Sequence, residues 1–159
     1  MEKTLEDIDK YIGEIQKKWA DGIISIGKAS IENRDVVELT ETFLNELYSF
    51  DNNKILFKPT KASNIQFRKN KNEFLSYFIG HKRISDEDVG FALEPWKEIT
   101  FENYDFSVYE NFILSMGNYF FKNYKNKITK VEFSFGYIFD KSENLRIVFH
   151  HSSVPFKKQ

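Results

Sequence analysis

Residues 130–139 read KVEFSFGYIF and residues 145–153 read LRIVFHHSS, with the polar link DKSEN at residues 140–144 between them. Both stretches are rich in β-branched and aromatic residues, and apolar side chains recur at every second position, as is typical of β-strands. A link this short joins neighbouring antiparallel strands. The stretches therefore predict a β-hairpin at the end of the chain.

The period of two extends upstream of this hairpin. Apolar and polar residues alternate over residues 99–104, and a further strand is predicted over residues 108–121, followed by the turn-rich link 123–126. The run ILF at residues 55–57 predicts one more short strand, which Pro59 ends. Short links between sequential strands indicate an antiparallel sheet.

The beginning of the chain has a helical period instead. Apolar residues recur every three or four positions from Leu5 to Ile26, and Thr4 with Asp7 provides a start signal. Gly22 and Gly27 weaken the second half of this helix, so we expect a bend or break near residues 20–27.

A second and a third helix follow. Asp35 and Glu38 form a capping-box pattern at the start of the second helix, which is predicted to end near Phe50, before the turn residues 51–53. A short third helix is predicted over residues 70–77. Helices first and strands afterwards, without alternation, indicate an α+β fold, and 159 residues fit one domain spanning residues 1–159.

Composition excludes several classes of function. The 23 basic and 24 acidic residues nearly cancel, so no strong field attracts nucleic acid or an anionic membrane. There is no cysteine, which removes disulfides and cysteine-containing zinc sites. No stretch approaches the ~18 apolar residues of a membrane span. We therefore expect a cytoplasmic protein that binds neither membrane nor nucleic acid.

The last predicted strand carries the most informative polar residues. Successive side chains of a strand point to opposite faces, so one face is predicted to hold Leu145, Ile147, Phe149, His151 and Ser153. This face is apolar until its last two members. His151 and Ser153 are therefore expected to look into the interior, either as a satisfied core pair or as the floor of a pocket. His150 and Ser152 are assigned to the opposite face.

Two other groups could carry chemistry. The three histidines, His81, His150 and His151, do not suit one zinc ion, because neighbouring strand residues diverge, although a carboxylate could replace one imidazole. Lys58, Thr60 and Lys61 offer charge and a hydroxyl where a strand ends, but a solvated turn would have the same composition.

Taken in order, seven segments of the chain resemble one known family: WADGI (19–23), ILFKPTKA (55–62), SYFIG (76–80), DVGFA (88–92), MGNYFF (116–121), VEFSFGY (131–137) and HHSSVP (150–155). The chain is similar to iota-class carbonic anhydrases, which are related to the association domain of calcium/calmodulin-dependent kinase II. The resemblance runs from residue 19 to residue 156. One departure is His81-Lys82, which stands where the family often has a further Gly and implies a different pocket rim.

The resemblance implies a nuclear-transport-factor-2-like cone, in which helices pack inside a strongly curved antiparallel sheet. It also implies reversible hydration of carbon dioxide to bicarbonate without metal or another cofactor, and a homodimer formed through the outer face of the sheet. The residues it carries over as catalytic are, with the strand faces assigned above, Thr60, Tyr77, His151 and Ser153. His150 and Ser152 join Thr60, Tyr77 and Ser153 as candidates for binding bicarbonate.

Two functions remain possible on these grounds. In the enzyme, His151 would accept the proton of the attacking water, because its ordinary pKa of ~6.5 lies near neutral pH. The alternative is a non-catalytic association or small-anion-binding module of the same fold. Such a module has no need of three hydroxyls together, so Thr60, Tyr77 and Ser153 favour the enzyme. Apolar residues on both faces of the last strands favour the homodimer.

Overall fold

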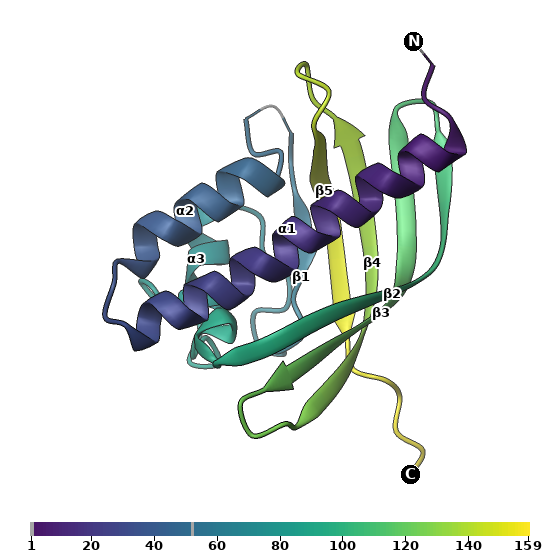
Figure 1. Ribbon diagram of the computed structural model, residues 1–159. Helices are drawn as coiled ribbons and strands as arrows, with labels where there is room; N and C mark the ends of the chain where they lie inside the picture. Colours follow the sequence, from purple (N-terminus) through teal and green to yellow (C-terminus); the bar gives the residue numbers. More distant parts are fainter. Residues whose placement is uncertain (1, 52) are drawn as a thin grey trace.

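The structure, a computed structural model, describes residues 2–51 and 53–159. Its five-stranded sheet has the order β1-β5-β4-β3-β2, and the helices lie against one face of it (Figure 1). In chain order the elements are α1 (Leu5–Ile31), α2 (Val36–Leu47), β1 (Leu56–Lys58), α3 (Lys71–Ile79), the 3-10 helix η1 (Phe91–Leu93), β2 (Trp96–Tyr109), β3 (Phe112–Asn123), β4 (Ile128–Phe139) and β5 (Leu145–Ser153). The predicted α+β class is confirmed.

The antiparallel meander is confirmed for β2 to β5. The strand predicted over residues 108–121 is wrong at its start, because it joins the end of β2 to β3 across the turn at Glu110 and Asn111. This turn contains no Gly or Pro to mark it, and Glu110 itself takes the positive φ of 56°. At the other edge, β1 pairs with β5 in parallel, with Lys58 beside His151.

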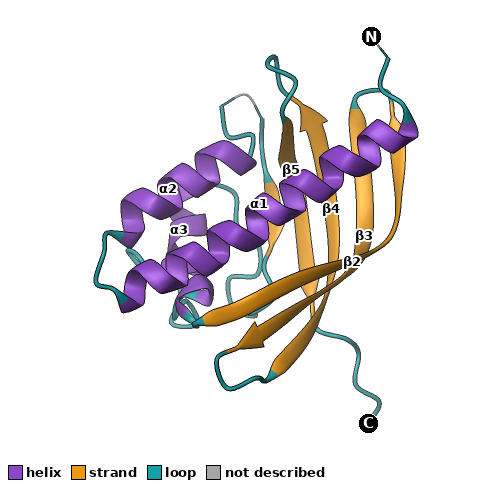
Figure 2. Cartoon of the chain, in the orientation of Figure 1, coloured by secondary structure: helices purple, strands orange, loops and turns teal. Residues whose placement is uncertain are grey.

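Curvature comes from the long strands. Register shifts interrupt the pairing of β2 with β3 between Trp96 and Glu98 and again between Asn103 and Asp105. Such bulges bend a strand and increase its twist. Figure 2 shows the result: β2 is long and bent, and the other long strands lie behind α1 in this view. The concave face of the sheet is thereby filled by α1.

The first helix begins as predicted and does not break. The Thr4 side chain caps it by accepting a hydrogen bond from the Asp7 backbone N–H. The Asp7 carboxylate in turn accepts a hydrogen bond from the Thr4 backbone N–H. The bend expected near residues 20–27 is wrong, since α1 is continuous to Ile31. Gly22 and Gly27 allow close packing instead: an added Cβ would lie 2.4 Å from the Phe43 ring and 2.8 Å from the Ala92 carbonyl oxygen.

The other two helices also match their signals. Asp35 accepts hydrogen bonds from the first turn of α2. That helix ends at Leu47 rather than near Phe50, because Tyr48 is extended and forms a bridge to Ile147 of β5. The turn predicted for residues 51–53 includes Asn52, which lies outside the described residues. The predicted third helix is confirmed as α3, capped by Asn70.

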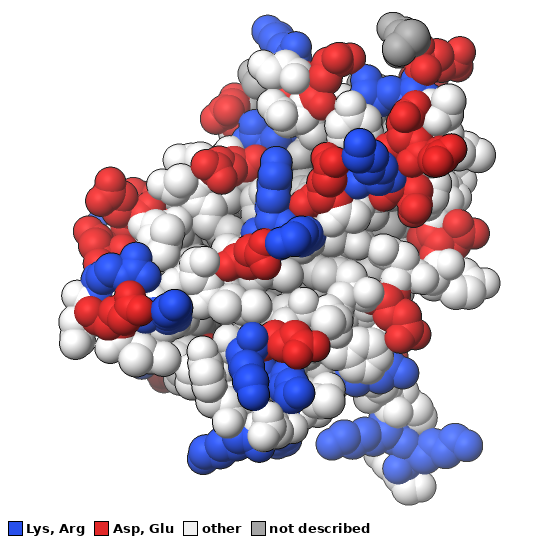
Figure 3. Space-filling model, in the orientation of Figure 1, with Lys and Arg blue, Asp and Glu red and all other residues white. Residues whose placement is uncertain are grey.

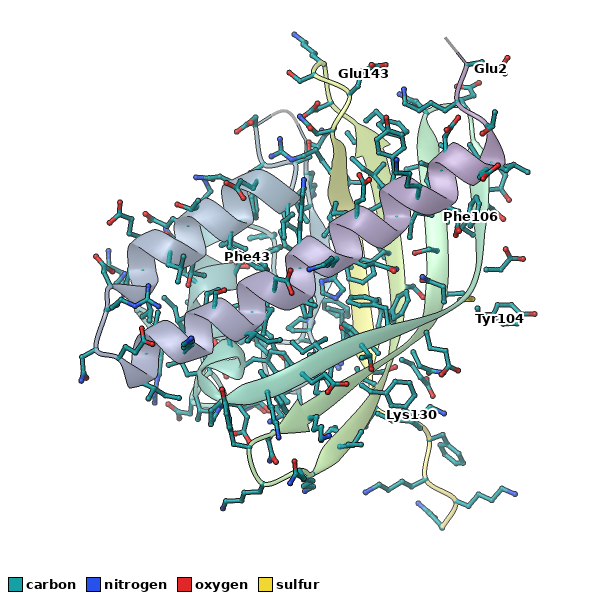
Figure 4. All side chains as sticks on the ribbon, in the orientation of Figure 1. Glu2, Phe43, Tyr104, Phe106, Lys130 and Glu143 are labelled. Carbon is teal, nitrogen blue, oxygen red and sulfur yellow. The ribbon has the colours of Figure 1, made fainter. Side chains whose placement is uncertain are left out.

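The core lies between α1, α2 and the concave face. Trp19, Phe43, Phe133, Phe135 and Ile147 are buried in it, and Figure 4 labels Phe43 between α1 and α2. Phe149 is predicted to share the inward face of the last strand with Ile147, and that placement is wrong: the residue is half-buried and lies beside a groove on the outer face. The reason is a bulge in β5, described below.

The surface shown in Figure 3 has acidic and basic side chains interspersed over most of its area. Such mixing matches the near-cancellation of charges in the sequence. Within residues 2–51 and 53–159, no helix is both long enough and apolar enough to cross a membrane.

Candidate active site

A β-bulge decides which end residues of β5 face the core. Ile147 pairs with Tyr137 and Phe149 with Gly136, so Val148 is an extra residue in β5. Beyond the bulge, the alternation of faces is reversed. His150 and Ser152 point inward, 2% and 1% exposed.

The prediction that His151 and Ser153 face the interior is therefore wrong. His151 is exposed and Ser153 half-buried, and both line a groove on the outer face of the sheet. The prediction assumes strict alternation of faces along the strand, and one extra residue in β5 breaks that alternation. The His and the Ser of this segment that face the interior are His150 and Ser152.

The imidazole of His150 lies between two phenyl rings. The sheet register places Phe135 and Phe57 beside it on either side, at centroid distances of 4.1 and 4.7 Å and nearly parallel. Burial lowers the pKa of His150 well below its usual 6.5, and the neighbouring His151 lowers this pKa further. His150 is therefore a neutral imidazole near pH 7.

Both nitrogens of this ring are hydrogen-bonded. Nδ1 lies 2.9 Å from the Tyr48 hydroxyl, which accepts a bond of 3.0 Å from the Trp19 indole N–H. Nε2 lies 3.0 Å from the Ser152 hydroxyl and 3.1 Å from the Tyr119 hydroxyl. Tyr119 and Ser152 are also hydrogen-bonded to each other. The network joins α1, the residue after α2, β3 and β5 around one histidine.

Thr60 and Tyr77 line the same pocket as Tyr119, His150 and Ser152. Thr60 follows β1 and Pro59, while Tyr77 lies on α3 and accepts a hydrogen bond of 3.3 Å from the Lys61 backbone N–H. Burial raises the pKa of the Tyr77 and Tyr119 phenols far above 10, and the Thr60 side chain partly offsets both increases. Both phenols therefore remain protonated hydrogen-bond donors at neutral pH.

A buried ion pair fixes the position of α3. Arg68 and Asp88, both with fully buried side chains, form two hydrogen bonds of 2.7 and 2.8 Å, and Ser76 of α3 also bonds to Asp88. The Arg68 guanidinium lies 5.8 Å from the centre of the Tyr77 ring. Residues 81–90 are mostly polar, yet Asp88 within them is buried, because its carboxylate is the internal partner of Arg68.

These side chains enclose a small pocket with apolar walls and hydroxyl groups. The residues that line it are Trp19, Phe57, Pro59, Thr60, Tyr77, Phe78, Phe91, Tyr119, His150 and Ser152. None of these lining residues is a carboxylate. The free volume is about 10 Å³, roughly what a single water requires. The arrangement can hold a small, uncharged or singly charged molecule by hydrogen bonds from hydroxyl groups.

The donor set does not suit a metal ion. Within the part of the chain that the structure describes, no three His, Asp or Glu side chains converge as metal ligands would. The three histidines stay apart, with His150 in the pocket, His151 on the outer face and His81 in the turn after α3. Both nitrogens of His150 are already engaged within the protein.

Comparison with known proteins identifies the family. The sequence profile of the family described as metal-independent carbonic anhydrase matches residues 10–154. A metal-independent carbonic anhydrase from Nostoc sp. is 32% identical over 151 residues, which cover 90% of this chain and 71% of that protein. The chain belongs to the metal-independent carbonic anhydrase family. The resemblance noted in the sequence is thus confirmed.

Solved structures agree with this assignment. The crystal structure of a cyanobacterial iota-carbonic anhydrase complexed with bicarbonate has a TM-score of 0.89 and 28% identity, with 94% of this chain and 93% of that chain covered. A protein from Xanthomonas campestris described as a calcium/calmodulin-dependent protein kinase II association domain has a TM-score of 0.61 at 13% identity, covering 99% and 91%. This second likeness shows the fold alone. A protein from Streptomyces avermitilis described as a putative dehydratase of the nuclear-transport-factor-2-like family has a TM-score of 0.60 at 11% identity, covering 97% and 100%, so the predicted fold is confirmed.

In this carbonic anhydrase family member, the structure brings together four of the six residues singled out from the sequence: Thr60, Tyr77, His150 and Ser152. His151 and Ser153 lie on the other side of the sheet. Sequence reasoning missed Trp19, Tyr48 and Tyr119, which complete the network. Tyr48 and Tyr119 lie 102 and 31 positions from His150 along the chain, so only the folded arrangement shows that they contact it.

Proposed function

We propose that this family member catalyses the reversible hydration of carbon dioxide to bicarbonate in the pocket formed by Thr60, Tyr77, Tyr119, His150 and Ser152. The observation that carries the proposal is the convergence of hydroxyl groups on an apolar pocket in a chain of this family. The similar cyanobacterial structure was solved with bicarbonate, which supports the same ligand here. The alternative, a non-catalytic association module, has no comparable observation in its favour.

The walls and the hydroxyl groups have separate tasks. Carbon dioxide is apolar and partitions into a site walled by Phe57, Phe78 and Phe91. When water attacks the carbon, negative charge develops on the oxygens. Once substrate is bound, hydroxyl donors directed at these oxygens stabilise the developing charge, which is where most of the rate increase is expected. The phenols of Tyr77 and Tyr119 remain protonated and suit this task.

The proton balance sets the role of His150. Hydration forms one C–O bond and releases one proton. His150 is a weak acceptor because burial lowers its pKa and both ring nitrogens are hydrogen-bonded. His151, which the sequence suggested as the acceptor, lies outside the pocket. We therefore propose that His150 orients hydroxyls and that the proton leaves to water or buffer.

The pocket has to widen when substrate binds. Its free volume is about 10 Å³, roughly that of one water. Bicarbonate has four non-hydrogen atoms and carbon dioxide three, so lining side chains must move outward to admit either molecule. The aromatic walls and the residues after β1 are the parts that would have to shift.

Stopped-flow carbon dioxide hydration tests the proposal. Thr60→Val and Tyr77→Phe each remove one hydroxyl with little change in volume, and each is expected to lower kcat/KM by ~10²-fold or more. Thr42→Val, on the exposed side of α2, and Tyr137→Phe, buried away from the pocket, are the matched controls and should retain activity. Incubation with a chelator should leave the rate unchanged. An inactive wild-type protein, or activity restored only by zinc, would contradict the proposal.

We further propose a homodimer formed through the outer face of the sheet, and a cytoplasmic enzyme. Two adjacent grooves on this face share Tyr104, Met116 and Ser134. Tyr104 is 84% exposed and points away from the sheet in Figure 4, and Met116 is 52% exposed. Apolar side chains gathered in this way favour contact with a second copy. For the compartment, the composition offers no disulfide that would require an oxidising environment, so the cytoplasm is proposed as the default.

A further inference from the structure

Tyr48 lies outside the pocket lining, and its hydroxyl is nevertheless part of the network around His150. It is the first residue after α2, it is fully buried, and its backbone bridges to Ile147 at the start of the bulge in β5. Its hydroxyl contacts the Trp19 indole on one side and Nδ1 of His150 on the other. Tyr48 is thus a link between the helices and the only histidine in the pocket lining.

The direction of these hydrogen bonds follows from the donors available. The Trp19 indole N–H can only donate, so the Tyr48 oxygen accepts from it. The O–H of Tyr48 then has Nδ1 of His150, 2.9 Å away, as the partner able to accept it. Leaving this buried O–H unpaired would be costly. Nδ1 is therefore an acceptor, and the single proton of the neutral imidazole is on Nε2.

We propose that Tyr48 is a positioning residue, whose hydroxyl holds His150 in the Nε2–H tautomer and so makes the Tyr119–Ser152 pair present an O–H donor to the substrate. This inference rests on the proposed function. It adds a residue that does not touch the substrate and assigns it a specific effect on those that do.

Counting protons shows why the tautomer matters. Tyr119 and Ser152 together carry two O–H hydrogens, and one of these is used in the bond between them. With Nε2 as a donor, both oxygens can accept from it, and the second O–H remains available to a ligand. With Nε2 as an acceptor, the second O–H would bond to the imidazole. The pocket would then lose one donor without any change in its shape.

The surroundings keep the imidazole of His150 neutral, and only a neutral imidazole has two tautomers. Phe57 and Phe135 cover both faces of the ring. None of the residues that line the pocket has a carboxylate that would stabilise an imidazolium. Burial lowers the pKa of His150 accordingly. A neutral ring has two tautomers, and the Tyr48 hydroxyl is the group on the Nδ1 side that selects between them.

Nitrogen-15 NMR of the imidazole tests this directly and requires no substrate. In a protein with His81→Gln and His151→Gln, only His150 remains, so its two ring nitrogens are assigned without ambiguity. We expect Nε2 to be protonated and Nδ1 not. Tyr48→Phe should introduce the Nδ1–H form. It should lower kcat by about tenfold, less than the ~10²–10³-fold typical when a donor is deleted outright, with little change in KM.

Tyr137→Phe is the matched control, because Tyr137 is an equally buried tyrosine whose hydroxyl bonds to Ser115 outside the pocket. Both variants should lose some stability, but only Tyr48→Phe should change the tautomer and kcat. An Nδ1–H form in the protein with Tyr48 intact, or an unchanged tautomer in Tyr48→Phe, would overturn the inference. If Tyr48→Phe does not fold, the nitrogen-15 spectrum of the protein with Tyr48 intact still tests the inference, because it shows which ring nitrogen of His150 is protonated. An inactive wild type with the Nε2–H form would refute the proposed function alone.

Discussion

At the scale of single residues, burial determines the chemistry of the site more than residue type does. His150 and His151 are neighbours in sequence, yet one is between two phenyl rings and the other is exposed on the opposite face. The first is held neutral and cannot act as an ordinary base near pH 7. The same burial keeps the Tyr77 and Tyr119 phenols protonated. The pocket is thereby a set of donors rather than of bases.

The depressed pKa of His150 predicts how stability depends on pH. The folded state keeps this imidazole neutral, whereas the unfolded chain takes up a proton below about pH 6.5. The stabilisation is therefore complete above that pH and is lost as the pH falls towards the lower pKa of the folded state. Between about pH 6.5 and 5, the free energy of unfolding should decrease by up to ~1.4 kcal/mol per pH unit.

Urea denaturation across this pH range measures the effect. His150→Phe should remove most of the slope, while His151→Asn, an exposed site, should keep it. An unchanged slope in His150→Phe would show that other groups cause it. The carboxylates with lowered pKa values, such as Asp140 and Glu87, titrate at lower pH and do not interfere.

At the scale of elements, the bulge in β5 separates what the sequence predicts from what it does not. The strand itself follows from composition, but its phase does not, because one extra residue reverses the faces of everything after it. The available signal was Gly136 in β4, opposite Phe149, where an added Cβ would lie 2.9 Å from the Cβ of Phe149. A glycine inside a strand often marks such a position.

The buried ion pair between Arg68 and Asp88 predicts a large loss of stability on mutation. It connects the segment after β1 to α3 and to the loop before η1. Asp88→Asn leaves the Arg68 charge buried without its partner, which typically costs ~3–5 kcal/mol. Asp21→Asn, which breaks the exposed pair with Lys17, should cost less than ~1 kcal/mol. Urea midpoints of the two variants measure this difference, and equal losses would contradict the role assigned to the pair.

At the scale of the whole molecule, the order of elements is what the sequence predicts best. Helical periods followed by strand periods indicate an α+β fold, and the predicted caps at Thr4 and Asp35 both appear in the structure. The site could be predicted only in part. Its residues come from α1, α3, β3, β5 and the segments after α2 and β1, and a single sequence gives no distances between Trp19, Tyr48 and His150.

The proposed homodimer predicts the behaviour of the outer face. Light scattering at about 10 μM should give twice the 18.9 kDa mass of one chain. Met116→Asp places a charge in the outer groove and should shift the protein to the monomer. Leu5→Asp, also at an exposed apolar residue but at the start of α1, should remain dimeric. A wild-type mass of 18.9 kDa would remove the dimer from the account.

The central claim is that the inner face of the sheet, not the outer one, holds the reacting molecules. Ser152 and Ser153 are neighbours in sequence on opposite sides of β5, so replacing each by Ala tests the two faces with the same chemical change. In stopped-flow hydration assays, we predict that Ser152→Ala lowers kcat/KM by ~10²-fold or more and that Ser153→Ala stays within about twofold of wild type. A large loss in Ser153→Ala with an active Ser152→Ala would contradict the account.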